Sequence, residues 1–197
     1  GPDTAVIVSQ GYRYILEIGR HNIAKKANTY TWVKPPRAVP VQRIWEVGGR
    51  LDHQGREVDA LDEAAVRAAA RAIAAQGIRT VAVALLHSYM NAAHEQRVGA
   101  IVREEIPEVM VSLSSEVLPV FREYERCLTT ILNAYVSPVV SGYVKRLEDR
   151  LQDCSIGAPL LLMKSSGGMT STRNAQKKPV ETALSGPAAG AVGAAFV

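Results

Sequence analysis

Four polar side chains in the stretch FREYERCLTTILNA have the types and the spacing to line a ligand site. With about 3.6 residues per helical turn, Glu123, Arg126, Thr130 and Asn133 fall within about a quarter of a helix circumference. Thr and Asn are mediocre helix formers and are not the usual choice for an exposed helix face. We therefore predict that these four residues face a substrate across a cleft. The alternative is a solvated helix face that carries one Glu–Arg ion pair.

A histidine in the stretch LLHSYMNAAHE is a second candidate. His87 follows a continuous apolar run that is typical of a buried strand, and ligands bind at the carboxyl ends of strands in open α/β sheets. His87 and His94 are too loosely spaced for a metal motif, so we predict no metal site. We predict that His87 faces the substrate, with hydrogen bonding that fixes the turn as the alternative.

Two glycine-rich stretches could also approach a ligand. KSSGGMTS places Ser165, Ser166, Gly167 and Gly168 in a tight turn, either a plain hairpin turn or a loop that faces the substrate.

The second stretch, SGPAAGAVGAA, predicts a helix that begins near Ser185 or Gly186, with Pro187 at its first position. Amide groups at such an end can hold an anion, but the stretch has neither the Lys–Ser/Thr pair of a P-loop nor the spacing G-x-G-x-x-G. Gly186, Gly190 and Ala194 recur on one helix face, which would let another backbone pack closely. We predict that Ser185, Gly186, Pro187 and Gly190 lie at a hinge or near a phosphate.

The elements that must position these residues alternate between strands and helices. An alternating order predicts the α/β class, with parallel strands joined by right-handed crossovers. Pro35, Pro36 and Pro40 favour an irregular linker over residues 23–40. We expect strands at 4–9, 41–52, 56–60, 78–86, 109–114, 159–164 and 180–184, and helices at 12–19, 62–76, 91–105 and 118–152.

Composition excludes several classes of protein. Two cysteines, Cys127 and Cys154, cannot build a disulfide framework, and we expect both to be structural thiols in a reducing compartment. No apolar run reaches the ~20 residues that span a bilayer, so we predict a cytoplasmic protein without a membrane partner. The net charge of +4 is mild and scattered, which argues against a nucleic-acid partner.

Taken in order, the segments GYRYILEIGR, LLHSYMNAAHE, VSLSSEVLPVFREYERCLTTILNAYVSP, KSSGGMTS and ALSGPAAGAVGAA resemble successive blocks of the hydantoinase A/5-oxoprolinase family. The resemblance covers nearly the whole chain. That family includes ATP-dependent N-methylhydantoinases, 5-oxoprolinases and subunits of acetone and acetophenone carboxylases. It implies a fragment of an actin-like (ribonuclease H-like) ATPase core with a βαβ-containing middle domain, and a partner subunit of the hydantoinase B type.

The resemblance also implies where the nucleotide binds. Members of the family hold ATP and Mg²⁺ with two Asp-Gly-Gly-Thr motifs, and no Asp in this chain precedes paired glycines. We therefore expect an internal fragment that holds no cofactor and is inactive by itself. The expected domains are the end of an N-terminal lobe and linker (3–40), an α/β unit (41–117), a long helical segment (118–155) and the start of the hydantoinase/oxoprolinase actin-like domain (156–197).

By resemblance, the parent protein uses ATP to activate an amide or enolate oxygen as a phosphate ester. Our leading hypothesis is an ATP-dependent hydrolase that opens hydantoin-like or 5-oxoproline-like cyclic amides. The alternatives are an ATP-dependent carboxylase subunit of the acetone or acetophenone type and a non-catalytic α/β interaction module. No residue of this chain is assigned a catalytic role.

Overall fold

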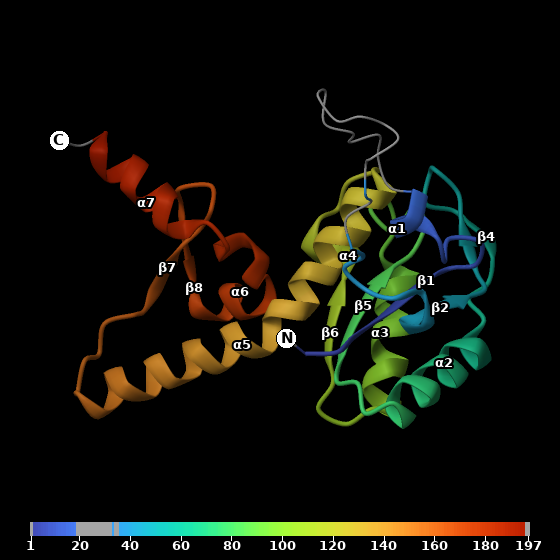
Figure 1. Cartoon of the computed structure of the whole chain (residues 1–197), viewed down its shortest axis with the longest axis horizontal. Helices are drawn as coiled ribbons and strands as arrows, with labels where there is room; N and C mark the ends of the chain where they lie inside the picture. Colours follow the sequence, from blue (N-terminus) through green and yellow to red (C-terminus); the bar gives the residue numbers. More distant parts are fainter. Residues whose placement is uncertain (1, 19–32, 34–35, 196–197) are drawn as a thin grey trace. The chain divides into compact units, whose positions relative to one another are not determined.

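The computed structural model describes residues 2–18, 33 and 36–195. The chain forms two compact units, Asp3–Ile131 and a second one that starts at Leu132, and each is described here by itself. Figure 1 shows the order of the elements along the chain.

The first unit is built around a parallel sheet with the strand order β2-β1-β5-β6. Its strands are β1 (Thr4–Ser9), β2 (Ile44–Val47), β5 (Thr80–Ala84) and β6 (Met110–Leu113). Strand β1 is buried at every position, as a strand covered on both faces of a parallel sheet must be. The predicted α/β class is therefore confirmed.

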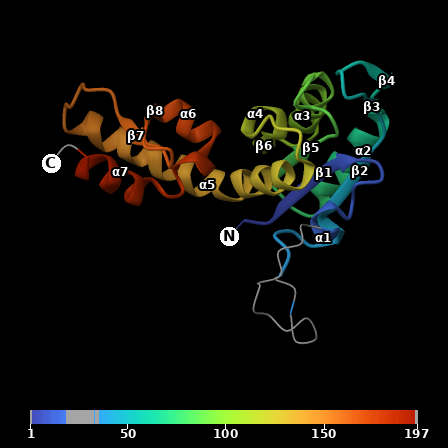
Figure 2. The ribbon, with the colours of Figure 1, turned by 90° about the horizontal axis from the view of Figure 1, so that it is seen from above.

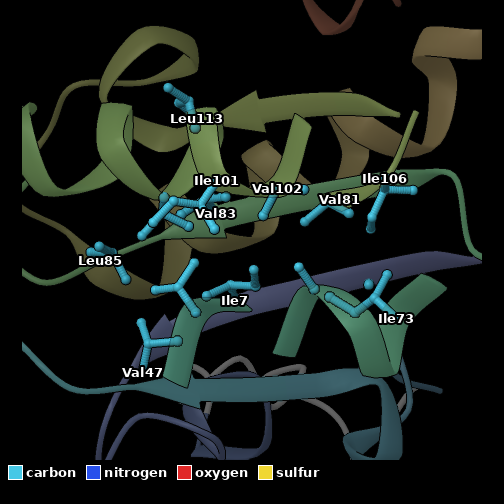
Figure 3. Packing of buried hydrophobic residues seen from close by; sticks show 14 of the residues in the cluster. Ile7, Val47, Ile73, Val81, Val83, Leu85, Ile101, Val102, Ile106 and Leu113 are labelled. Atoms are coloured by element: carbon cyan, nitrogen blue, oxygen red, sulfur yellow. The ribbon is translucent and has the colours of Figure 1, made fainter. Parts of the chain in front are cut away.

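Helices α2 (Glu63–Ala75) and α3 (Ala93–Glu105) pack against the sheet and against each other. Side chains alternate between the two faces of a strand, and the core with these helices takes Ala5 and Ile7 from β1 and Val81 and Val83 from β5. Figure 3 shows Ile73 of α2 among these residues. The opposite set, which includes Val6 and Val8, therefore points to the other face of the sheet.

Helix α2 begins at its predicted capping residue, Asp62, whereas the residue before α3 is Ala92 and not the predicted Asn91. The carboxylate of Asp62 accepts a hydrogen bond from the Ala65 amide at 2.9 Å, which satisfies a free donor of the first turn of α2. The Asn91 side chain accepts from the Ala93 amide at 3.0 Å in front of α3. Helix α2 ends at Ala75 and is followed by Gln76 and then by Gly77, whose φ of +70° suits a residue without a Cβ.

The segment expected to form one strand at 41–52 divides into three elements. Val41–Arg43 is a 3₁₀ turn, β2 joins the parallel sheet, and β3 (Arg50–Leu51) pairs antiparallel with β4 (Glu57–Asp59). Gly49 permits the division, because its φ is +114° and a Cβ there would lie 2.9 Å from Leu61 Cα. The single long strand was therefore a wrong prediction.

The long helix α5 (Glu123–Asp153) begins in the first unit, after the short helix α4 (Ser114–Val117), and continues into the second with Pro138 inside it. The second unit adds the hairpin of β7 (Leu161–Met163) and β8 (Met169–Ser171), α6 (Thr172–Lys177) and α7 (Ser185–Ala194). Figure 2 shows the hairpin and α6 beside the later part of α5.

The strand predicted at 180–184 is wrong, because Pro179–Thr182 forms a 3₁₀ turn. Three features favour the turn. Pro179 stands at its start, the Thr182 hydroxyl donates to the Pro179 carbonyl at 2.8 Å, and the Val180 amide donates to Asn133 Oδ1 at 3.2 Å. Asn133 lies in α5, 47 residues before Val180, so the local sequence around residues 180–184 gives no sign of this hydrogen bond.

The predicted domain boundary near residue 40 does not match the strand order of the sheet. Residues 3–40 were assigned to a preceding lobe, but β1 lies between β2 and β5 and shares their core. Within the helix expected at 12–19, the structure shows α1 (Ile15–Ile18). Most of the predicted linker, residues 23–32, 34 and 35, lies outside the described residues.

Candidate functional site

The carboxyl ends of β1 and β5 meet at a topological switch point. The chain passes from β1 to β2 on one side and later reaches β5 on the other side of β1. Ligands of open α/β sheets bind in the crevice outside such a point. A small hollow lies there, lined by Val8, Tyr12, Ile15, Ala84, Leu86, Glu123, Arg126 and Cys127.

Two sides of the hollow differ in chemistry. Val8 and Ala84 are paired across the sheet and project from the face opposite the α2–α3 core, which makes the strand side apolar. The first turns of α5 supply Glu123 and Arg126, which make the helix side charged. The structure thus brings together two of the four residues of the predicted polar strip.

Arg126 is almost completely buried, with 1% of its surface exposed. One guanidinium nitrogen donates to the Leu85 carbonyl at 2.7 Å, and another donates to the Val120 carbonyl at 3.4 Å. The guanidinium carbon lies 5.5 Å from the centroid of the Tyr89 ring, within cation–π range. The buried Nε has no hydrogen-bond partner in the described part of the chain. Burial lowers the pKa of Arg126, but a guanidinium remains charged at neutral pH.

A buried polar network holds the end of β5 beside the hollow. The carboxylate of Glu95, which has no exposed surface, accepts from the amides of Leu85 and Ser115 at 2.8 Å each and from the Ser114 hydroxyl at 2.6 Å. The Ser9 hydroxyl accepts from the Leu86 amide at 2.9 Å. These contacts fix the backbone from which the hollow is built.

His87 follows the hollow's Leu86 and is held in an unusual conformation. Its φ is +57°, a left-handed value that costs energy for a residue with a Cβ. Its Nδ1 is buried and has no hydrogen-bond partner in the described structure, and the ring lies 6.1 Å from the Tyr89 ring. Burial lowers the pKa of His87, an effect that the charge of Glu123 partly opposes. His87 is thus near the site but does not line the hollow.

Cys127 lines the hollow without the properties of a nucleophile. Burial raises the pKa of its thiol to about 12, so the thiol stays protonated at neutral pH, and the thiolate is the reactive form. Cys154, in contrast, is exposed.

The remaining two residues of the strip bond to backbone. The Thr130 hydroxyl donates to the Arg126 carbonyl one turn earlier at 2.6 Å. Asn133, in the second unit, donates to the Lys177 carbonyl at 3.1 Å and accepts from Val180. Both residues are fully buried, and neither lines the hollow. Their contact with a substrate stays a prediction.

The stretch KSSGGMTS contains the turn of the β7–β8 hairpin, which agrees with the first of its two interpretations, a plain hairpin turn. The Ser165 amide and hydroxyl both donate to the Glu181 carbonyl at 2.6 Å, and Gly167 has a φ of +88°. Ser166 and Gly168 lie in the same turn. A role toward a ligand remains a prediction for Ser165, Ser166, Gly167 and Gly168.

Helix α7 begins at Ser185, so Pro187 is its third residue. The prediction that Pro187 occupies the first position is therefore wrong. The helix buries no residue, and a Cβ added at Gly186 or Gly190 would meet no atom within 4 Å. The small-residue face is therefore open in this chain. The hinge or phosphate role of Ser185, Gly186, Pro187 and Gly190 is still a prediction.

Ser9, Tyr12 and Glu95 were not among the predicted site residues. Ser9 could have been found, because it ends a predicted strand and the carboxyl ends of parallel strands share one edge. Glu95 gave no such signal, since an acidic residue in a helix's first turn is usually exposed.

Metal and membrane signals are weak in the described residues. No group of three or more His, Cys, Asp or Glu side chains there could hold a metal ion. Helix α5 is long and apolar enough to cross a membrane, with a mean hydropathy of 1.2 over its most apolar window, but core helices of soluble proteins meet the same criterion.

Comparison with known proteins agrees with this architecture. Residues 1–106 match the family model described as hydantoinase/oxoprolinase N-terminal region, and residues 126–197 match the model described as hydantoinase/oxoprolinase. The chain therefore belongs to the hydantoinase/oxoprolinase family.

Two relatives are subunits of named enzymes. The chain is 34% identical over 190 residues to the caprolactamase subunit alpha of Pseudomonas jessenii, covering 95% of the chain and 27% of the relative. It is 32% identical over 209 residues to the acetophenone carboxylase gamma subunit of Aromatoleum aromaticum, covering 100% of the chain and 28% of the relative.

Solved structures share the fold. Nucleotide-free acetone carboxylase, studied for ATP-dependent acetone carboxylation, superposes with a TM-score of 0.89 at 28% identity, covering 100% of this chain and 29% of that one. The ATP-dependent caprolactamase of Pseudomonas jessenii superposes with a TM-score of 0.83 at 34% identity, covering 94% of this chain and 27% of that one. These matches confirm the predicted fold class, which is part of an actin-like core. The chain spans less than a third of the length of each of these relatives.

Proposed function

We propose that this chain forms part of an ATP-dependent enzyme that opens a cyclic amide. The observation that carries the proposal is the match to an ATP-dependent caprolactamase along nearly the whole chain, at 34% identity and a TM-score of 0.83.

The residues of this chain would bind and orient the substrate. ATP and Mg²⁺ need phosphate-binding groups and carboxylates, and the chain has no Asp followed by paired glycines. We therefore derive no step that involves nucleotide from these residues. ATP and Mg²⁺, bound elsewhere in a longer protein, would supply the activation of the amide oxygen.

A carboxylase subunit is the second candidate. Acetone carboxylase has the higher TM-score, 0.89, and the acetophenone carboxylase gamma subunit aligns over the whole chain. In that case the substrate would be a ketone whose enolate oxygen is activated. Overall similarity does not separate the two candidates, because both kinds of relative match the same residues.

A partner subunit is also proposed. Two relatives are called alpha and gamma subunits, so they act in complexes. We propose a partner of the hydantoinase B type for the longer protein. The cytoplasmic location predicted from the sequence stays a prediction.

The test is ATP turnover by a longer protein that contains this chain, purified with its partner subunit. Release of ADP is measured with hydantoin, 5-oxoproline or ε-caprolactam, and with acetone or acetophenone plus bicarbonate. We expect a cyclic amide to stimulate turnover. Stimulation only by a ketone with bicarbonate would support the carboxylase, and stimulation by neither would favour a non-catalytic module.

A further inference from the structure

We infer that the β3–β4 hairpin is a strap that lies across the carboxyl edge of the parallel sheet and opens separately from the core. The strap comprises residues 50–59, and side chains of Asn91 and His94 hold its tip closed. Its opening would admit a ligand to the edge, a role that rests on the proposed function. The opening itself does not depend on that function.

The strap connects the loops that follow the two central strands. The Arg50 guanidinium carbon lies 5.9 Å from the centroid of the Tyr12 ring, in the loop after β1. At the tip of the strap, a Cβ added at Gly55 would lie 3.1 Å from the Cβ of Asn91, in the loop after β5. Because β1 and β5 meet at the switch point, the strap lies across the edge where ligands of such sheets bind.

The strap also lies close to His87 at the same edge. Burial is the main cause of the lowered pKa of His87, and the charge of Arg126 lowers it further. The charges of Arg50 and His53, both in the strap, act in the same direction. The closed strap therefore contributes to the surroundings of His87 as well as to those of Tyr12.

The strap is held together by its own turn. The Asp52 carboxylate accepts hydrogen bonds from the amides of Gln54 and Arg56, at 2.8 and 2.9 Å, and from Arg56 Nε at 2.7 Å. The Asp52 amide also donates to the Arg56 carbonyl at 2.9 Å. All of these contacts are internal to the strap, so they persist when it moves as one piece.

The attachment of the strap to the rest of the first unit is slight. Within the strap, all of which the structure describes, Leu51 is the only buried side chain, and it is not part of the main core cluster. Every residue of β4 is exposed. A two-stranded hairpin is at best marginally stable by itself, so the strap should open at a lower free energy than the core. Gly48 and Gly49 precede the strap and can absorb the backbone change.

Two polar contacts form the latch at the tip. Asn91 Nδ2 donates to the Gly55 carbonyl at 2.9 Å. The buried His94 has its Nε2 2.6 Å from Glu57 Oε2, and Glu57 is exposed. When the strap opens, water can replace both contacts, so each of them adds only modestly to the closed state.

The closed strap leaves little room at the edge. The hollow at the switch point has a volume of about 10 Å³, which is room for about one water molecule. Tyr12 lines this hollow and also contacts Arg50 of the strap. A larger ligand can therefore reach the edge only if its cover moves, and the strap is attached weakly enough to do so.

Thiol labelling of the 197-residue chain tests the opening. Leu51→Cys introduces a thiol at a position with 3% exposure, which N-ethylmaleimide reaches only when the strap opens. Cys154→Ser removes the exposed native thiol, and the buried Cys127 reports on opening of the core. We expect labelling at position 51 to be at least about tenfold faster than at Cys127, as measured by mass spectrometry. Equal rates would overturn the proposal, since the strap would then open only together with the core.

Two variants in the same background remove the latch. Asn91→Asp loses the donor to the Gly55 carbonyl but keeps the Oδ1 acceptor for the Ala93 amide in front of α3. Glu57→Ala removes the partner of His94 at an exposed position.

Each latch variant should speed labelling at position 51 by about fivefold and leave labelling of Cys127 unchanged. Asp59→Ala is the matched control, because Asp59 is an exposed carboxylate of the same strand and takes no part in the latch. Unchanged labelling in both latch variants, or an equal increase in the control, would overturn the assignment of the latch.

A disulfide tests the role of the strap in a longer protein, purified with its partner subunit. Gly55→Cys and Asn91→Cys together place two thiols at the latch, where the two Cβ positions are 3.1 Å apart. Oxidation should lower the ADP release stimulated by a cyclic amide at least about tenfold, and dithiothreitol should restore it. Wild-type protein treated in the same way is the control. Full activity of the oxidised variant would overturn the role of the strap in ligand access.

The outcomes separate this inference from the proposed function. If the wild-type longer protein opens no cyclic amide, the proposed function is wrong, and the labelling rates decide on the strap alone. If wild type and oxidised variant open the ring equally well, the function stands and the strap does not control access.

Discussion

Arg126 links the start of α5 to the end of β5 through one buried side chain. It is buried to 1% exposure, its guanidinium holds the carbonyl of Leu85 at the end of β5, and it lines the hollow. A buried cation is tolerated because carbonyls, the Tyr89 ring and the nearby Glu95 carboxylate compensate its charge. Any change at this residue must therefore affect stability.

Arg126→Ala should lower the free energy of unfolding by about 3 kcal/mol, because it removes a large buried side chain together with its hydrogen bonds to the Leu85 and Val120 carbonyls. Urea denaturation of this chain measures the effect. Arg122→Ala is the control, since that residue is exposed and should cost at most about 0.5 kcal/mol. A loss below about 1 kcal/mol for Arg126→Ala would show that its buried contacts are not formed in solution.

His87 should make stability depend on pH. Burial lowers its pKa in the folded chain from the ordinary value of 6.5, so the unfolded chain takes up a proton at a pH where the folded chain does not. The stabilisation is complete above pH 6.5 and is lost as pH falls through 6.5 toward the lowered folded-state pKa.

His87→Asn tests this directly, because Asn does not titrate and tolerates the left-handed conformation of residue 87. Between about pH 8 and pH 5.5, the wild type should lose more unfolding free energy than the variant, as measured by urea denaturation at each pH. Parallel losses in both proteins would mean that the His87 ring is not desolvated.

At the scale of elements, α7 is a helix with an open face. A Cβ at Gly190 meets no atom within 4 Å, so Gly190→Ala should raise stability by roughly 1 kcal/mol through helix propensity alone. Gly190→Leu should also be tolerated in this chain. In a longer protein, where we expect another backbone to pack on this face, Gly190→Leu should cost about 1–3 kcal/mol.

Gly167→Ala is the matched control for these thermal melts. Gly167 has a φ of +88°, and a Cβ there would lie 3.1 Å from Val192 Cγ2, so this variant should be destabilised by about 1 kcal/mol. Equal melting-temperature losses for Gly190→Leu in the short and the longer protein would contradict the expected packing partner.

Local patterns predicted the elements that depend on local forces. The apolar run at β1 and the capping residue Asp62 led to correct elements because their determinants lie within a few residues. The strand predicted at 180–184 failed because its decisive partner, Asn133, comes from a distant part of the chain. Helical spacing likewise placed Glu123 and Arg126 on one face, but only the fold shows that this face is buried against β5 and not solvated.

At the scale of the whole molecule, the sequence lacks the Asp followed by paired glycines that the resemblance assigns to nucleotide binding in the family. We expect no useful affinity of the 197-residue chain for ATP–Mg²⁺, since the sequence contains no Asp with paired glycines to bind the metal and the phosphates. Isothermal titration calorimetry tests this expectation. A dissociation constant in the micromolar range would mean that nucleotide binds to residues we have not assigned.

The central claim is that ATP is consumed to open a cyclic amide. The most direct measurement follows ADP and ring-opened product in the same reaction, by chromatography and mass spectrometry, with the longer protein, its partner subunit and ε-caprolactam or 5-oxoproline. We predict equal amounts of ADP and ring-opened product, and no product when ATP is omitted. Ring opening without ATP, or ADP release that leaves every offered cyclic amide intact, would contradict the claim.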